Sequence, residues 1–161
     1  YEELDGGIVA IGDNWRRGMM VAKIKEMVPF FNFVTLIHPS SVISRKVTIG
    51  EGSVILAGAI INSNVSVGEH CIVNTRSSLD HDCNVGSFSS LAPGVTLGGK
   101  VIVGDYTAIS LGANVIHSIK IGEHTVIGAG ATVIRDVGSN VVAYGTPAKI
   151  KRAREVGEPY L

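Results

Sequence analysis

The 161-residue sequence carries no net charge, has only two cysteines and contains no long apolar run. Its 14 lysine and arginine residues balance 14 aspartate and glutamate residues, so a polyanion such as nucleic acid would meet no general electrostatic attraction. No apolar run approaches the roughly 18 residues of a membrane-spanning helix, and no signal peptide opens the chain. We therefore expect a cytoplasmic protein that has neither nucleic acid nor a membrane as a partner.

What the sequence does contain is an aliphatic residue at every sixth position. A six-residue period places successive apolar residues at unrelated angles around a helix, so an α-helix is excluded. The abundance of valine, isoleucine and threonine favours strands instead. Four positions after each aliphatic residue comes a mostly small one. The aliphatic positions are Ile43, Ile49, Ile55, Ile61, Val67, Val73, Leu79, Val85, Leu91, Leu97, Val103, Ile109, Val115, Ile121, Ile127 and Val133.

A second rhythm groups three hexads into one 18-residue coil. Glycine recurs every 18 residues, which suggests a corner that needs a positive φ once per coil. The pattern predicts a triangular prism with three short strands per coil and coils stacked about 4.8 Å apart. Sixteen hexads correspond to about five coils. These glycines are Gly50, Gly68, Gly86, Gly104 and Gly122.

The two cysteines, Cys71 and Cys83, occupy small-residue positions of the repeat and lie twelve residues apart. Residues stacked directly above one another in such coils are 18 apart, so we expect no disulfide between them. Buried, reduced thiols fit a reducing compartment.

The segments on either side of the repeat predict other structure. Residues 7–11 resemble a buried strand, followed by a turn at residues 12–14, and Asn14 is expected to cap a helix that ends before Pro29. We expect residues 1–36 to be the end of an α/β, Rossmann-like unit whose front half lies upstream, and residues 37–145 to form the β-helix. At the other end, Thr146 and Pro147 predict a short basic helix within residues 146–161.

Four sequence segments together with the repeat resemble one family. They are "IVAIGDN", "LIHPSSVIS", "NTRSSLDHDC" and "VVAYGTPAKIKR", and they are similar to the left-handed β-helix acyltransferases. Within that family they resemble the group of sialic acid O-acetyltransferases and bacillosamine-pathway N-acetyltransferases. The resemblance implies a left-handed, mainly β prism, acetyl-CoA as co-substrate and a homotrimer. It also implies transfer of an acetyl group to the amino or hydroxyl group of a nucleotide-linked amino sugar or of sialic acid, with amino groups the first expectation.

Acyl transfer to an amine or hydroxyl needs a base near the acceptor. Histidine suits this role because its unperturbed pKa of about 6.5 lets it accept a proton near neutrality. The resemblance makes His81 the base and Asp82 the carboxylate that orients it. Neighbouring residues of a strand point to opposite faces, so Asp82 can reach His81 only where the backbone turns. Asp80 stays open as the alternative partner, and a solvated surface histidine is the alternative to a catalytic one.

The resemblance also assigns binding residues around this base. In relatives the position of Ser90 often carries a histidine that contacts the acetyl carbonyl, and serine can still donate one hydrogen bond. The coenzyme A positions are Ser90, Gly99, Leu111 and Ala129, and the acceptor positions are Gly12, Asp13, Asn14 and Asn74.

Two other functions remain as alternatives. The γ-class carbonic anhydrases use the same prism and bind zinc through three histidines. Here His81 and His117 are two coils apart, but position 122 is glycine and His124 is offset by two residues. Because an open catalytic zinc site needs three protein ligands, the set is one short and we expect no metal. A purely structural trimerisation platform would leave the "LDHDC" segment unexplained.

Overall fold

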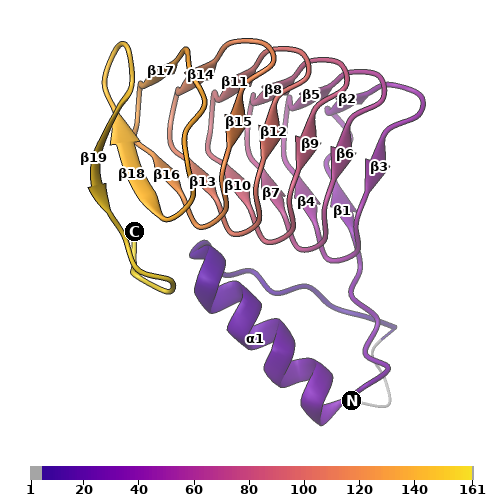
Figure 1. The fold of residues 1–161 in the computed structure, drawn as a ribbon. Helices are drawn as coiled ribbons and strands as arrows, with labels where there is room; N and C mark the ends of the chain where they lie inside the picture. The colour runs from indigo at the N-terminus through magenta and orange to yellow at the C-terminus, as the bar shows by residue number, and fades with distance from the viewer. Residues whose placement is uncertain (1–4, 161) are drawn as a thin grey trace.

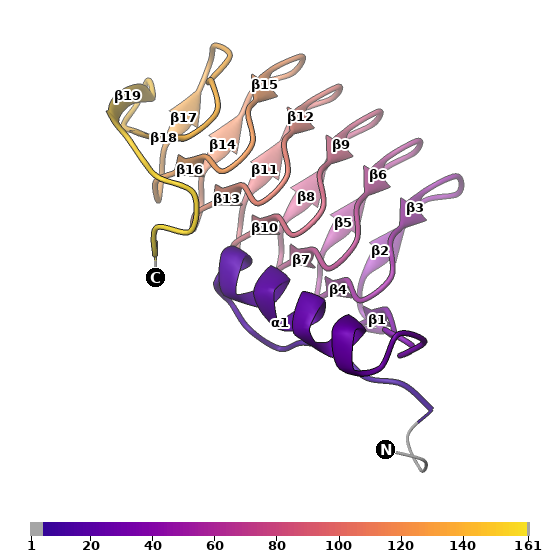
Figure 2. The same ribbon diagram turned by 60° about the horizontal axis from the view of Figure 1, so that its bottom comes forward.

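A computed structural model describes residues 5–160, most of which wind into a parallel β-helix (Figure 1). The first four residues of the predicted N-terminal unit and the last residue of the predicted C-terminal segment lie outside this range. The helix α1 (Asn14–Met27) lies along the side of the prism that β4, β7 and β10 form (Figure 2). In residues 5–160 no helix has the length and apolar character needed to cross a membrane.

Seventeen two-residue strands follow one another at intervals of six residues and form the three faces of the prism. Each of the first fourteen strands pairs in parallel with the strand 18 residues later, as in the register of Val54 with Ile72. The two-residue strands are β1 (Leu36–Ile37), β2 (Val42–Ile43), β3 (Thr48–Ile49), β4 (Val54–Ile55), β5 (Ile60–Ile61), β6 (Ser66–Val67), β7 (Ile72–Val73), β8 (Ser78–Leu79), β9 (Asn84–Val85), β10 (Ser90–Leu91), β11 (Thr96–Leu97), β12 (Ile102–Val103), β13 (Ala108–Ile109), β14 (Asn114–Val115), β15 (Lys120–Ile121), β16 (Val126–Ile127) and β17 (Thr132–Val133).

Two longer strands follow, β18 (Val141–Tyr144) and β19 (Lys149–Ala153). The three sheets run in the orders β1-β4-β7-β10-β13-β16-β18-β19, β17-β14-β11-β8-β5-β2 and β15-β12-β9-β6-β3. The 18-residue coil predicted from the repeat is therefore confirmed. Two strands extend the prism to about six coils: β1 precedes Ile43, and β18 (Val141–Tyr144) follows Val133.

The second residue of each strand points inward and fills the axis of the prism. From Ile55 to Val133 these aliphatic residues are buried, which confirms the predicted core column. The small residues at the next corner are buried as well, and their polar groups are satisfied by the neighbouring coil. Ser53 Oγ donates to the carbonyl oxygen of Gly68 at 2.8 Å. Thr107 Oγ1 donates in the same way to Gly122 at 2.7 Å.

The glycine column has a different physical cause from the predicted one. Gly50 and its equivalents lack a positive φ; the left-handed residue of each hexad comes two positions later, from Lys46 to Gly130. A Cβ placed on Gly50 would lie 2.6 Å from the backbone nitrogen of Glu69 on the next coil. Glycine is therefore required because adjacent coils approach too closely for a side chain.

The N-terminal segment differs from the prediction in two respects. The predicted strand over residues 7–11 is wrong, because only Gly7 forms a bridge, to Phe33, and a single bridge is no ladder. Asp13, rather than Asn14, caps α1, and its carboxylate accepts from the Arg16 backbone nitrogen at 2.8 Å. Asn14 is instead drawn toward the prism, where its amide donates to the carbonyl oxygen of Thr107 at 3.1 Å.

An aromatic column joins α1 to the prism. His70, Phe88, Tyr106 and His124 occupy the left-handed corner positions of four successive coils, and their rings stack with centroids 4.8–5.0 Å apart. Trp15 of α1 packs against two of these rings, at 5.6 Å from Tyr106 and 5.8 Å from His124. The column therefore gives the N-terminal segment an apolar surface on which to lie.

The predicted C-terminal helix is wrong. Residues 149–153 form β19 (Lys149–Ala153), which pairs antiparallel with β18 (Val141–Tyr144) as a hairpin. The strand β18 continues the first sheet by pairing in parallel with β16, so its other edge offers unpaired backbone groups. Pairing with β19 satisfies these groups, which outweighs the helical tendency of the basic segment.

Candidate active site

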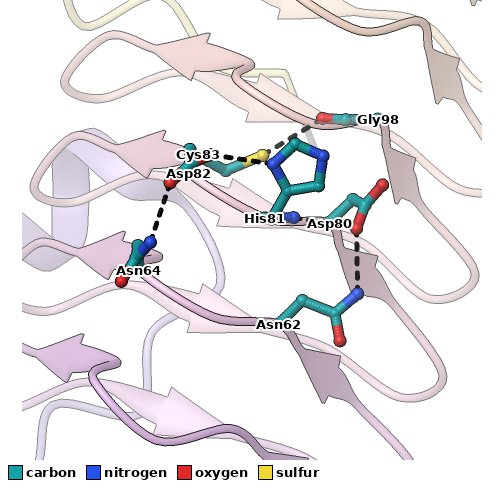
Figure 3. A network of polar contacts seen from close by, with 7 residues as sticks. All are labelled: Asn62, Asn64, Asp80, His81, Asp82, Cys83 and Gly98. Atoms are coloured by element: carbon teal, nitrogen blue, oxygen red, sulfur yellow. Dashed lines mark hydrogen bonds and ion pairs between the residues drawn. The ribbon is translucent and has the colours of Figure 1, made fainter.

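The strongest candidate for chemistry lies at the corner between β8 and β9 (Figure 3). His81 Nδ1 is 2.8 Å from an Asp82 carboxylate oxygen, and the backbone of Asp82 is left-handed, with φ of 59°. This backbone conformation turns neighbouring side chains toward the same side, which strand alternation would prevent. Asn64 Nδ2 donates to the other Asp82 oxygen at 3.0 Å.

Asp80 takes a different part in the same corner. Its carboxylate accepts from the backbone nitrogen of His81 at 2.8 Å and from Asn62 Nδ2 at 2.9 Å. Asp82 therefore contacts the imidazole ring, whereas Asp80 supports the backbone beneath it. Each aspartate is tied to an asparagine 18 residues earlier, so the corner is braced by the preceding coil (Figure 3).

The hydrogen bonds of His81 and Asp82 indicate which of their atoms carry a proton. Hydrogen bonds from His81 and then Asn64 lower the pKa of Asp82, so its carboxylate is ionised at neutral pH. An ionised carboxylate accepts a hydrogen bond, so Nδ1 carries a proton in this contact, and in the neutral imidazole Nε2 then holds the lone pair. The His81 side chain is half exposed, so Nε2 is open to a ligand.

The next coil leaves room for this ring only because it carries glycine. A Cβ on Gly99 would lie 2.6 Å from His81 Nε2 and 2.8 Å from Cε1. Lys100 donates its backbone N–H to the carbonyl oxygen of His81 at 2.8 Å, which holds the two coils in register. Gly99, 18 residues after His81, therefore lies directly against the ring on the next coil.

Neither cysteine takes part in this site. Both thiols are free and buried, which confirms that they form no disulfide. Cys83 points inward and its sulfur donates to the carbonyl oxygen of Gly98 at 3.1 Å (Figure 3). Burial raises the pKa of both thiols, that of Cys71 to about 11, so neither is a thiolate at neutral pH.

A second group of predicted residues lines a cavity of about 430 Å³, a size that ligand pockets commonly have. Its walls are mainly aliphatic, with a few polar groups among them. Gly12, Asn74, Ser90 and Leu111 of the predicted binding residues line it. Tyr160 also lines it, and no pattern in the sequence pointed to this residue. The remaining lining residues are Ile72, Leu91, Ala92, Pro93, Ala108, Ile109 and Ser110.

The turn at residues 12–14 is held in place by a buried arginine. Arg17 is 1% exposed, and its Nη1 donates to the carbonyl oxygens of Ile11 at 2.8 Å and Gly12 at 3.1 Å. Its Nη2 donates to Asn14 Oδ1, also at 2.8 Å. On the other side it donates to two carbonyl oxygens of the aromatic column, those of His70 and Phe88. Sequence reasoning missed Arg17, since nothing local distinguishes it from its exposed neighbour.

Within one chain the predicted residues therefore form two groups. His81, Asp82 and Gly99 share one corner, whereas Gly12, Asn74, Ser90 and Leu111 line the cavity. Asp13 caps α1, and Asn14 connects the turn to the prism. Ala129 is exposed one coil beyond Leu111, on the same column.

Metal-ligating side chains come together at a third place. Among residues 5–160, one group of such side chains has its ligand atoms within 4.8 Å of one another, namely Glu51, Glu69 and His70. Lys25 Nζ lies 3.1 Å from Glu51, so this carboxylate already has a cationic partner. His124 stacks on Tyr106 in the aromatic column, away from the corner of His81.

The chain is similar to several solved structures of acetyltransferases. PerB from Caulobacter crescentus, in complex with CoA and GDP-perosamine, is 41% identical, with a TM-score of 0.88 over 91% of this chain and 70% of that one. A variant of the perosamine N-acetyltransferase from that organism has asparagine in place of a histidine and is 40% identical, with a TM-score of 0.89; the match covers 94% of this chain and 71% of that one. The acetyltransferase domain of PglB from Neisseria gonorrhoeae, in complex with acetyl coenzyme A, is 31% identical, with a TM-score of 0.86 over 89% of this chain and 69% of that one.

One curated relative agrees with these structures. The UDP-N-acetylbacillosamine N-acetyltransferase of Bacillus subtilis is 40% identical over 53 residues, which are 31% of this chain. The match spans 22% of that protein's length, about a fifth. No model of a protein family matches the chain.

The fold and the related structures show an acyltransferase of the left-handed β-helix class. Within that class the chain belongs to the family of sugar N-acetyltransferases that includes the Caulobacter and Neisseria enzymes. The expected fold and family are therefore confirmed.

Proposed function

We propose that this protein transfers the acetyl group of acetyl-CoA to the amino group of a nucleotide-linked amino sugar. The observation that carries the proposal is the 2.8 Å contact between His81 Nδ1 and Asp82, which leaves Nε2 open beside Gly99. The ligands of the related structures, CoA with GDP-perosamine and acetyl coenzyme A, support the choice of both substrates.

The reaction is a direct transfer in a ternary complex. The amine nitrogen attacks the thioester carbonyl carbon, and His81 Nε2 takes the proton that the nitrogen loses as the carbon–nitrogen bond forms. The negative charge of Asp82 stabilises the imidazolium. Collapse of the tetrahedral intermediate breaks the carbon–sulfur bond, and the imidazolium proton is available to the departing thiolate of coenzyme A. This mechanism uses no cysteine nucleophile. Neither cysteine could serve as one, because both thiols are buried and neutral.

The binding residues divide between the two substrates. Gly12, Asp13, Asn14 and Asn74 serve the acceptor, and residues 1–36 are the acceptor-side unit. Ser90 is assigned to the thioester carbonyl. Gly99, Leu111 and Ala129 are assigned to the pantetheine arm; Leu111 and Ala129 are exposed at the same corner of successive coils.

A homotrimer accounts for the two separate groups of residues. The His81 corner of one subunit would complete the cavity of its neighbour, so that each active site lies between two prisms. Exposed outward-facing aliphatic residues on β2 and β5, Val42 and Ile60, support an interface on that face, because a single chain leaves them in water. Light scattering should give three times the chain mass, and a monomer would overturn this arrangement.

The proposed setting is the cytoplasm, where acetyl-CoA is available. The buried, reduced state of Cys71 and Cys83 supports a reducing compartment.

The proposal is tested by thiol release from acetyl-CoA. The acceptor panel is GDP-perosamine, a UDP-linked 4-amino sugar and free sialic acid, and the proteins are wild type, His81→Ala and His117→Ala. His117 is a matched control, because it is exposed on the same column two coils later. We expect turnover of an amino sugar that falls by roughly 10²- to 10⁴-fold in His81→Ala and stays unchanged in His117→Ala. Turnover of sialic acid alone would indicate O-acetylation, and full activity of His81→Ala would exclude this base.

A further inference from the structure

The C-terminal segment reaches the predicted acceptor turn by a route that the structure defines closely. After β19, Arg154 donates its backbone N–H to Asn140 O and its Nη1 to His124 O, both at 2.9 Å. Glu158 is paired with Arg152, whose Nη2 lies 2.6 Å from the carboxylate. The segment is therefore tied to the end of the prism before it passes α1.

The segment then crosses the start of α1 at a glycine. Gly157 has a positive φ of 80°, and a Cβ there would lie 2.9 Å from Trp15 Nε1. A residue without a side chain is required because the backbone passes directly over the indole ring. This contact directs the last residues toward the turn at residues 12–14.

Tyr160 ends this path between the turn and the prism. Its hydroxyl oxygen accepts from the Asn14 backbone nitrogen at 3.2 Å and donates to Gly12 O, also at 3.2 Å. Ser90 Oγ is 3.3 Å away on β10. Either hydroxyl can be the donor in that third contact. Burial raises the pKa of Tyr160, so the phenol stays protonated at neutral pH.

The same tyrosine is a wall of the 430 Å³ cavity, together with Gly12, Asn74 and Ser90. It is the only contributor from beyond residue 111 among the described residues that line it. The phenol therefore joins the N-terminal turn, the prism and the C-terminal segment at the place where the acceptor is proposed to bind.

We propose that Tyr160 is an acceptor-site residue: its ring contacts the sugar, and its hydroxyl holds the Gly12–Asn14 turn at a set distance from Ser90. This inference rests on the proposed function. A nucleotide-linked sugar entering the cavity meets the phenol on one side and Asn74 on the other. Of the residues assigned to coenzyme A, Ser90 and Leu111 line this cavity, whereas Gly99 and Ala129 do not.

The test separates acceptor binding from coenzyme binding. Steady-state kinetics with acetyl-CoA and GDP-perosamine, or the amino sugar that the panel selects, are measured on wild type, Tyr160→Phe and Tyr144→Phe. Tyr144 is a matched control, since it lies half exposed on β18 and is absent from the residues that line the cavity. Calorimetric titration of the same nucleotide sugar, without acetyl-CoA, gives its dissociation constant for each protein.

We expect Tyr160→Phe to raise both the acceptor KM and its dissociation constant roughly tenfold, because the hydroxyl links to the turn and to Ser90 are lost while the ring remains. The KM for acetyl-CoA should stay unchanged, and kcat should change by no more than about twofold. Tyr144→Phe should match wild type throughout. Melting temperatures of the three proteins show whether folding is intact.

Two outcomes overturn the inference, and they differ. If wild type acetylates the sugar and Tyr160→Phe has the same acceptor KM, or if both KM values rise equally, Tyr160 is no acceptor-site residue although the proposed function stands. If wild type neither binds nor acetylates any nucleotide sugar of the panel, the proposed function fails and the inference fails with it. Tyr160→Ala adds a check on the ring, since removing the wall should raise the acceptor KM further than Tyr160→Phe does.

Discussion

Gly99 lies so close to the His81 ring that a single added methyl group would occupy the space beside Nε2. A Cβ at that position would be 2.6 Å from Nε2, shorter than any ordinary contact between a carbon and a nitrogen. The ring is in turn held from the other side by Asp82, at 2.8 Å from Nδ1. The proposed base is thus positioned by the residue that follows it, Asp82, and by Gly99 on the next coil.

Gly99→Ala should therefore reduce acetyl transfer more than it reduces stability. The new methyl group must push the imidazole away from its present place, because the Gly99 backbone is bonded into the coil stack. We expect kcat to fall by roughly 10- to 100-fold, a typical effect of misplacing a catalytic group by about 1 Å. Turnover of acetyl-CoA with the selected sugar is the measurement.

Gly138→Ala is the control for this substitution. A Cβ there would meet no atom within 4 Å, and the residue has no positive φ. It should leave both turnover and melting temperature unchanged. Equal activity of Gly99→Ala and wild type would show that Nε2 is not the reacting atom.

Asp82→Asn and Asp80→Asn should separate the two aspartates beside His81. Only Asp82 contacts the ring, so replacing it removes the charge that stabilises the imidazolium. We expect kcat to fall by roughly 10²-fold in Asp82→Asn and by less than about tenfold in Asp80→Asn. Comparable losses in both variants would contradict the assignment of the orienting role to Asp82.

The lowered pKa of Asp82 also predicts a pH dependence of stability. Its folded pKa lies below the unfolded value, so its stabilising contribution is present above the unfolded pKa and is lost as pH falls through the folded one. Wild type should therefore lose more stability than Asp82→Asn between neutral and acid pH. Urea unfolding at several pH values measures this, and parallel curves would exclude the contribution.

Arg17→Met should destabilise the attachment of the N-terminal segment. The change removes donors to the carbonyl oxygens of Ile11, Gly12, His70 and Phe88 while leaving those groups partly or fully buried. We expect the free energy of unfolding to fall by roughly 2–4 kcal/mol, because buried acceptors are left without a hydrogen-bond donor. Denaturant unfolding followed by Trp15 fluorescence reports on it, because Trp15 lies at this junction. Arg16→Met, at an exposed neighbour, should change the free energy of unfolding by less than about 0.5 kcal/mol.

Cys71→Ala/Cys83→Ala should retain acetyl transfer at near wild-type kcat. Both thiols are buried, and the pKa of Cys71 is raised to about 11, so neither supplies a nucleophilic thiolate at neutral pH. In wild type the raised pKa favours the protonated folded state, so stability should fall as pH rises above the ordinary thiol value of 9.0. Loss of activity in a folded double variant would point to a covalent mechanism instead.

Much of the fold was predictable because its signal is periodic and local. An aliphatic residue every six positions can fill one axis only if the chain turns a corner in every hexad, and β1 to β17 follow that rule. The glycine at every eighteenth position was predicted correctly but for the wrong reason. Gly50 is required because the next coil lies too close for a side chain, and its own φ is not positive. The distance between neighbouring coils cannot be read from the sequence of a single hexad.

The C-terminal segment and the N-cap of α1 were predicted wrongly from local sequence signals. Thr146 and Pro147 favour the start of a helix, yet residues 149–153 form a strand that pairs with the open edge of β18. Asn14 is a good cap, yet Thr107, 93 residues away in sequence, engages its amide. In both places a partner outside the local segment decided the conformation: β18 for residues 149–153, and Thr107 for Asn14.

Some features of the candidate site were likewise predictable from the sequence, and others were not. The sequence by itself determined the repeat, the core column, the free cysteines and the histidine between two aspartates, because each depends on residue type and spacing alone. Only the tertiary structure decided that Asp82 rather than Asp80 meets the His81 ring, that Arg17 anchors the acceptor turn, and that Tyr160 reaches Ser90. These contacts depend on one left-handed residue and on segments up to 148 positions apart, and such geometry arises only when the coils are stacked.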